Sequence, residues 1–94
     1  MNSKPIRVQR KRTKGWRMPE NTKCVDRSTK WGNPFKPTRL QDQAHVVNAF
    51  RLFYHYDVEF REAVKRELRG KNLACFCALN VPCHADVLIE WANE

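Results

Sequence analysis

The feature that most constrains the fold of this chain is a continuous apolar run, Leu-Ala-Cys-Phe, at residues 73–76. The run lies in the segment from Lys71 to Phe76, directly after Gly70. A short, unbroken apolar run fits a strand covered on both faces, as in a parallel sheet. Such a strand needs helices packed against its sheet, so the run predicts an α/β protein.

Helical patterns lie on both sides of this strand. Apolar residues recur at helical spacing from Ala44 to Tyr54, and Thr38 is the expected N-cap of that helix. A second helix is expected from Asp57, as N-cap, to a stop at Gly70. A third is expected over residues 85–93.

Two short strands are expected before the helices, at residues 6–9 and 23–26. The predicted order is therefore β-β-α-α-β-α, with about three helices and a small, partly parallel sheet in a single domain over residues 1–94. In such sheets ligands bind where strand C-termini meet helix N-termini. This rule directs attention to the segment from Cys75 to Asp86.

The positive charge of the chain is concentrated at its start. The formal net charge is +8, and residues 1–17 hold seven of the 18 Lys and Arg residues and no acidic residue. A block of this kind attracts the phosphates of a nucleotide or a nucleic acid. The alternative is a solvated basic tail that only aids solubility.

No stretch approaches the roughly 18 consecutive apolar residues that cross a bilayer. No apolar run follows the basic N-terminus as it would in a signal peptide. We therefore expect a cytoplasmic protein without a membrane partner.

Three cysteines and a histidine form the motif Cys75-x-Cys77-x5-Cys83-His84. Four soft ligands suggest zinc. However, if Cys75 and Cys77 both lie in the strand, their side chains are about 6.6 Å apart. Zinc–sulfur bonds of about 2.3 Å allow at most about 4.6 Å between two sulfurs. Neighbouring side chains on a helix also diverge, which separates Cys83 from His84. These arguments favour free thiols and no metal, although the chain would bring the ligands together if it curled after Cys75.

The same residues also suggest a reactive or ligand-binding site. Cys83 is expected to start the last helix, where the helix dipole favours a thiolate, and His84 can act as acid or base. Cys77, Cys83 and His84 are the candidate catalytic residues. Cys75 is interpreted as a core residue.

Two further segments suggest contacts to a nucleotide. In the basic segment, Trp16 stands among cations, so that a base can stack on its ring while the cations hold phosphate; the candidates are Arg10, Arg12, Lys14, Trp16 and Arg17. In the second, Trp31 and Asn33 offer a stacking ring and an amide that both donates and accepts. The alternative for each segment is a structured loop whose aromatic residues pack onto the core.

Four stretches together resemble a known family of small phage and bacterial domains, DUF4326. They are Arg-Lys-Arg-Thr-Lys-Gly-Trp-Arg-Met-Pro (10–19), Lys-Trp-Gly-Asn-Pro-Phe (30–35), Leu-Arg-Gly-Lys-Asn-Leu-Ala-Cys-Phe-Cys (68–77) and Pro-Cys-His-Ala-Asp-Val-Leu (82–88). Where the family pattern usually has Gly-Arg-Pro, this chain has Asp26-Arg27-Ser28. The resemblance implies a fold and a phage context, with a bacterial host cytoplasm as the setting, and implies no reaction or cofactor.

Two functional hypotheses follow. The first is a pocket directed at a nucleotide or nucleic acid, in an enzyme that processes nucleotides or nucleosides. The second is a non-catalytic phage protein that binds nucleic acid or modulates the host, in which the cysteines are structural, with or without zinc. The sequence leaves the oligomeric state open.

Overall fold

Residues 4–94 are described by a computed structural model of the chain. The elements are β1 (Arg7–Gln9), β2 (Thr22–Cys24), α1 (Gln43–Tyr54), α2 (Val58–Leu68), β3 (Asn72–Cys75) and α3 (His84–Ala92). This is the α/β order predicted from the sequence. The boundaries differ by a few residues, most of all for α1.

The three strands form one parallel sheet in the order β1-β3-β2. Val8 pairs with Ala74 on one side of β3, and Lys23 pairs with Leu73 on the other side. The apolar run of β3 is explained by burial on both faces, because successive side chains of a strand point to opposite faces and Leu73, Ala74 and Cys75 are all buried. All three strands therefore end at the same edge of the sheet.

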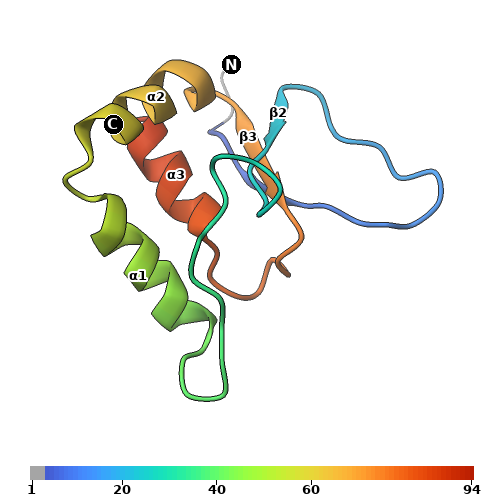
Figure 1. Ribbon diagram of the computed structural model, residues 1–94. Helices are drawn as coiled ribbons and strands as arrows, with labels where there is room; N and C mark the ends of the chain where they lie inside the picture. Colours follow the sequence, from blue (N-terminus) through green and yellow to red (C-terminus); the bar gives the residue numbers. More distant parts are fainter. Residues whose placement is uncertain (1–3) are drawn as a thin grey trace.

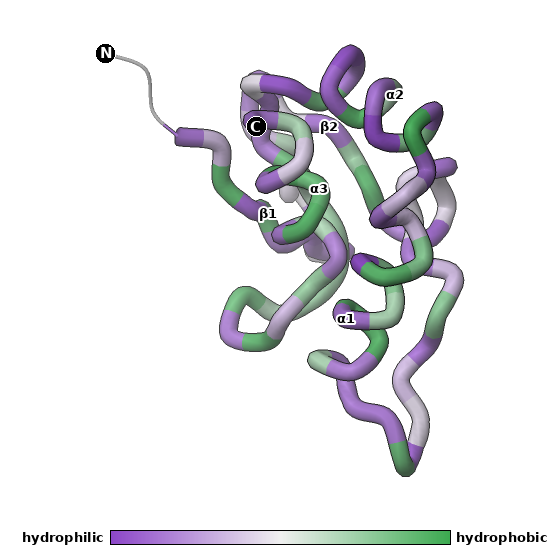
Figure 2. The backbone as a smooth tube through the Cα atoms, turned by 90° about the vertical axis from the view of Figure 1, so that its left-hand side faces the viewer, coloured by the Kyte–Doolittle hydropathy of each residue, from purple (hydrophilic) through white to green (hydrophobic). Residues whose placement is uncertain are grey.

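The helices gather on one side of the sheet, as Figure 1 shows, and α3 packs against β3, β1 and the other two helices. The core centres on Phe50 of α1, whose ring stacks on Trp91 of α3 with 6.2 Å between ring centroids. Phe60 of α2 lies 6.1 Å from Phe50. Figure 2 shows α2 as largely hydrophilic, and only Val64 and Leu68 of this helix are buried.

Each helix begins at a capping residue. Asp57 caps α2 by accepting a hydrogen bond from the Phe60 amide at 3.0 Å, as the sequence predicted. Asp42, not Thr38, caps α1 through the His45 amide, also at 3.0 Å. Thr38 instead accepts from the amides of Leu40 and Gln41, in a turn before the helix. Several polar N-cap candidates precede α1, so the sequence placed its start four residues early.

No helix among residues 4–94 is long and apolar enough to span a membrane.

Candidate functional site

A cleft of about 470 Å³ opens at the edge of the sheet where the three strands end. It is lined by side chains that follow each strand or begin a helix: Arg10, Arg12, Asp26, Arg27, Ser28, Gln43, Cys75, Phe76, Cys77 and His84. Arg10 directly follows β1, and Cys75 ends β3. The position matches the rule that ligands bind beyond the C-terminal ends of parallel strands.

An ion pair forms part of the lining of the cleft. Arg10 lies 2.5 Å from the Oδ2 atom of Asp26, with the Cys24 sulfur 3.0 Å from the same guanidinium nitrogen. Burial raises the pKa of Asp26, but hydrogen bonds from Ser28, Cys24 and Arg10 outweigh it and lower the pKa to about 2. Asp26 is therefore a charged anchor at neutral pH and not a proton donor.

Two arginines stand over one aromatic ring at the mouth of the cleft. The guanidinium carbons of Arg10 and Arg12 lie 4.7 Å and 4.5 Å from the centroid of the Phe76 ring, a cation–π distance. Arg10 is neutralised by Asp26. Arg12 is exposed and makes no ion pair or hydrogen bond with any residue from 4 to 94. The ring thus holds a guanidinium whose five donors are open to a ligand.

Arg27 also lines the cleft, and it orders the loop at residues 31–35. Its guanidinium donates to the carbonyl oxygens of Asn33 and Phe35, the latter at 2.9 Å. Gly32 permits this packing, because a Cβ atom at that position would lie 2.6 Å from the Cα atom of Arg27. Segments 26–28 and 31–35 therefore form one ordered unit.

The structure separates Trp31 and Asn33 from the cleft. The Trp31 side chain is buried, with its ring centroid 5.7 Å from that of Phe60. The buried Asn33 amide donates to the Val46 carbonyl at 3.0 Å, and its oxygen accepts from the Phe35 amide at 2.9 Å. Both side chains hold the loop onto the helices. This is the structured-loop alternative from the sequence analysis, in which the segment packs onto the core.

The basic loop between β1 and β2 extends away from the helices (Figure 1). Of its described residues, Arg10 and Arg12 line the cleft, while Lys11, Lys14, Trp16 and Arg17 do not. The residues predicted to contact a nucleotide therefore do not form one site. Arg10 and Arg12 line the cleft, and Trp31 and Asn33 are buried in the core. Lys14, Trp16 and Arg17 lie in the projecting loop.

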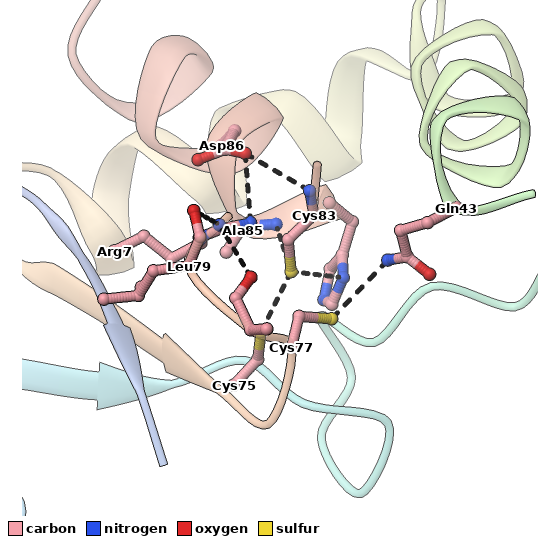
Figure 3. A network of polar contacts seen from close by, with 10 residues as sticks. Arg7, Gln43, Cys75, Cys77, Leu79, Cys83, Ala85 and Asp86 are labelled. Atoms are coloured by element: carbon pink, nitrogen blue, oxygen red, sulfur yellow. Dashed lines mark hydrogen bonds and ion pairs between the residues drawn. The ribbon is translucent and has the colours of Figure 1, made fainter. Parts of the chain in front are cut away.

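The sulfur atoms of Cys75, Cys77 and Cys83 lie within 4.8 Å of one another (Figure 3). The assumption that Cys77 continues the strand is not met, since β3 ends at Cys75 and the chain bends at residues 76–77. The distance argument against a shared metal ion, which rested on that assumption, therefore no longer applies.

Cys83 caps α3, as expected from the sequence. Its sulfur accepts from the Ala85 amide at 3.5 Å, and the Asp86 carboxylate accepts from the Cys83 amide at 3.2 Å. The expected activation of the thiol does not follow, because Cys83 is fully buried. The hydrogen bond with Cys75, together with burial, raises the pKa of Cys83 to about 12, against the opposite influence of His84.

His84 is buried with a defined orientation. Its Nε2 atom lies 2.6 Å from the Val25 carbonyl oxygen, which can only accept, so Nε2 carries the proton. In the neutral ring Nδ1 then holds a bare lone pair, and it lies 3.6 Å from the Cys83 sulfur. The divergence expected for neighbours on a helix is absent because Cys83 has an extended backbone and only caps the helix.

Sequence analysis missed several residues of the site. Asp26 and Ser28 follow β2 directly, and the rule about strand C-termini would have selected them had it been applied to all three strands. Arg7 was counted only as a charge, yet it donates to the carbonyl oxygens of Ala78 and Leu79 at 3.1 Å and 2.8 Å and pairs with Asp86. Gln43, which donates to the Cys77 sulfur at 3.5 Å, carried no sequence signal.

The fold and the cleft together define a small α/β domain with a cleft of basic lining at the C-terminal edge of a parallel sheet. The family profile of DUF4326, a domain of unknown function, matches residues 8–94. The chain belongs to this family, as its motifs indicated. No curated protein and no solved structure matches it.

Proposed function

We propose that the cleft binds a nucleotide, with Arg12 holding its phosphate. The observation that carries the proposal is the Arg12 guanidinium, unpaired among the described residues and held 4.5 Å over Phe76 at the cleft mouth. A guanidinium binds phosphate through two parallel hydrogen bonds. The stacking on Phe76 limits the motion of Arg12 before a ligand arrives, which reduces the entropy lost on binding.

The charges around Arg12 favour an anion. Arg10, Arg12 and Arg27 line the cleft with Asp26 as the single carboxylate, so the lining has a net positive charge. Low-dielectric walls strengthen the attraction of a cleft for the opposite charge. Phosphate is the anion that best fits guanidinium groups on more than one wall.

The size and the remaining lining favour a nucleoside attached to that phosphate. A cleft of about 470 Å³ lies within the usual range for small-molecule sites. Gln43 offers an amide, which can both donate to and accept from the edge of a base. The exposed edge of Phe76 adds apolar surface beside it.

The geometry gives less support to thiol catalysis by Cys83. Its sulfur is fully buried, and His84 already donates from Nε2 to a backbone carbonyl. Of the three candidate catalytic residues, Cys77 is the one that is only half-buried, but burial raises the pKa of its thiol, with Cys83 adding to the effect. The proposal is therefore one of binding.

The test is a calorimetric titration of the reduced protein with nucleoside 5′-monophosphates, nucleoside 5′-triphosphates and inorganic phosphate. Arg12→Gln should weaken nucleotide binding by about tenfold or more, as expected for the loss of a charged hydrogen-bonding pair. Arg17→Gln is the matched control, since it removes an exposed cation of the same loop that does not line the cleft. Equal losses in both variants, or no nucleotide binding by the wild type, would contradict the proposal.

A second candidate is binding of a nucleic-acid strand by the projecting loop, where Lys11, Lys14 and Arg17 are all exposed. Binding of this kind depends steeply on salt, and each lost phosphate contact lowers the slope. A Lys14→Gln, Arg17→Gln double variant should then flatten the salt dependence of binding to a single-stranded oligonucleotide. A strand that enters the cleft would instead respond to Arg12→Gln.

A further inference from the structure

The floor of the cleft contains a cluster of four potential metal ligands from two elements. Cys75 ends β3, Cys77 lies two residues beyond it, and Cys83 and His84 form the start of α3 (Figure 3). We propose that these four residues bind one zinc ion through the three sulfur atoms and His84 Nδ1. The inference does not depend on nucleotide binding in the cleft above.

The distances are close to those of a tetrahedral site. Zinc–sulfur bonds of about 2.3 Å and zinc–nitrogen bonds of about 2.0 Å give about 3.8 Å between two ligand sulfurs and about 3.5 Å between a sulfur and a nitrogen. The Cys83 sulfur and His84 Nδ1 are 3.6 Å apart. The sulfurs of Cys75 and Cys83 are 2.9 Å apart, and no pair among the three cysteines exceeds 4.8 Å. The three sulfurs already form one cluster, and the His84 ring, which lies beside Cys83, must move toward the other two sulfurs when the ion binds.

The orientation of His84 is the second, independent observation. Histidines that bind metals almost always donate their other ring N–H to a carboxylate, a backbone carbonyl or water. His84 does so, with Nε2 2.6 Å from the Val25 oxygen. This bond fixes the tautomer in which Nδ1 is unprotonated, and Nδ1 is the nitrogen that lies 3.6 Å from the Cys83 sulfur.

A disulfide between Cys75 and Cys83 explains less of the cluster. It would use two sulfurs, and it would leave both Cys77 and the bare Nδ1 atom of His84 without a role. A metal ion uses all four groups. Three thiolates and an imidazole are soft or borderline ligands, which select zinc over magnesium or calcium.

The surroundings suit the charge of the proposed site. Zinc bound by three thiolates and a neutral imidazole carries one net negative charge, and binding releases the three thiol protons to the solvent. Arg7, whose side chain is only 8% exposed, holds the loop between Cys77 and Cys83 through the carbonyl oxygens of Ala78 and Leu79. Arg7 also pairs with Asp86 at 3.2 Å, so the contribution we assign to it is to hold the loop that carries the cluster.

Four protein ligands leave zinc no open position, so the role we infer is structural. The ion would join the end of the central strand to the start of α3, and it would fix the floor of the cleft. Such a link matters most in small domains, whose cores are limited by size.

The test measures metal content and ligand type directly. The reduced protein, expressed in zinc-supplemented medium and purified without chelator, should contain one zinc per chain by elemental analysis and by native mass spectrometry. After replacement by cobalt(II), its spectrum should show the intense d–d bands of a tetrahedral site and sulfur-to-cobalt charge transfer.

Single substitutions assign the ligands. Cys77→Ser and His84→Gln should each lower zinc affinity by about 100-fold or more, measured by competition with a chromophoric chelator. Cys77 is half-buried, so its serine variant is the one that keeps the fold most readily. Cys24→Ser is the matched control, because it removes a half-buried thiol outside the cluster and should leave the metal in place.

Three results would overturn the proposal. The first is that the wild-type protein binds neither zinc nor cobalt. The second is that protein isolated from cells without reductant contains no metal and has a Cys75–Cys83 disulfide. The third is that Cys24→Ser and Cys77→Ser lose metal equally. The His84→Gln variant gives a further check. If the fraction of this variant that still binds cobalt has the same spectrum as the wild type, His84 is not a ligand.

Discussion

Arg10 and Asp26 join the ends of two strands that do not touch each other. Arg10 follows β1 and Asp26 follows β2, the two outer strands, and their side chains meet at 2.5 Å beyond the end of β3. The Arg10 amide also donates to the Cys75 carbonyl at 2.7 Å. The contact therefore links the two outer strands across the end of the central one, at the edge of the sheet where the cleft opens.

The hydrogen bonds that Asp26 accepts, first from Ser28 and then from Cys24 and Arg10, predict a specific dependence of stability on pH. The folded protein lowers the pKa of Asp26 from 3.8 to about 2, so the carboxylate stabilises the fold fully above its unfolded pKa and loses that effect as the pH falls toward 2. The contribution at neutral pH is about 2 kcal/mol. Asp26→Asn should therefore lower the free energy of unfolding at neutral pH and flatten its fall between about pH 5 and about pH 2.

Urea unfolding at several pH values makes this comparison. Asp42→Asn is the control, because Asn caps a helix as well as Asp does and Asp42 is exposed. Parallel pH curves for the wild type and Asp26→Asn would show that the ion pair does not stabilise the fold.

Asn33 is predicted to support the fold and not the ligand. Asn33→Ala leaves the Val46 carbonyl and the Phe35 amide without their partner, which costs about 1–3 kcal/mol in a buried setting. Nucleotide affinity should stay within a factor of about two, measured below the unfolding transition. Asn48→Ala, on the exposed face of α1, is the control for stability. A large loss of nucleotide affinity in a folded Asn33→Ala protein would mean that Asn33 does contribute to ligand binding.

Gly32 is predicted to be intolerant of any side chain. An added methyl group meets the backbone of Asp26 and Arg27 at 2.6–2.9 Å, so Gly32→Ala must push the two loop segments apart. We expect a loss of about 1–3 kcal/mol in the free energy of unfolding. Gly15→Ala adds the same methyl group where nothing lies within 4 Å, although at a positive φ of 86°, and should cost about 1 kcal/mol. A Gly32→Ala protein as stable as Gly15→Ala would mean that the loops do not pack as described.

The order of thiol labelling should follow burial. In chelator-treated, reduced protein, Cys24 and Cys77 should react with iodoacetamide before Cys75 and Cys83, because the first two are half-buried and the last two are buried. This differs from the sequence-based expectation of a reactive Cys83. Timed alkylation with peptide mapping gives the order, and early labelling of Cys83 would restore it as a candidate nucleophile.

Much of the fold followed from local patterns, and much of the site did not. The apolar run at 73–76 predicted a strand covered on both faces, and Asp57 predicted a helix start, because burial and capping depend on a few neighbouring residues. The burial of Trp31 depends on the contact of Gly32 with Arg27 and on packing against Phe60, which lies 29 residues further along the chain. Contacts of this kind leave no periodic signal in the sequence.

The positions of the cysteine side chains also could not be predicted from the local sequence. The spacing of Cys75 and Cys77 is compatible with an extended strand or with a bend, and the two give different sulfur positions. Arg7 holds the bent loop in place from β1, more than 70 residues away in the sequence. A local argument about strand geometry could not include that constraint.

The most direct test of a ligand site at the sheet edge is an NMR titration of ¹⁵N-labelled protein with a nucleoside 5′-monophosphate. The account predicts saturable shifts of the amides that border the cleft, at Arg10, Ser28 and Cys77, with little change in α2. Shifts confined to the projecting loop at residues 13–20, or no saturable shifts with any nucleotide, would contradict it.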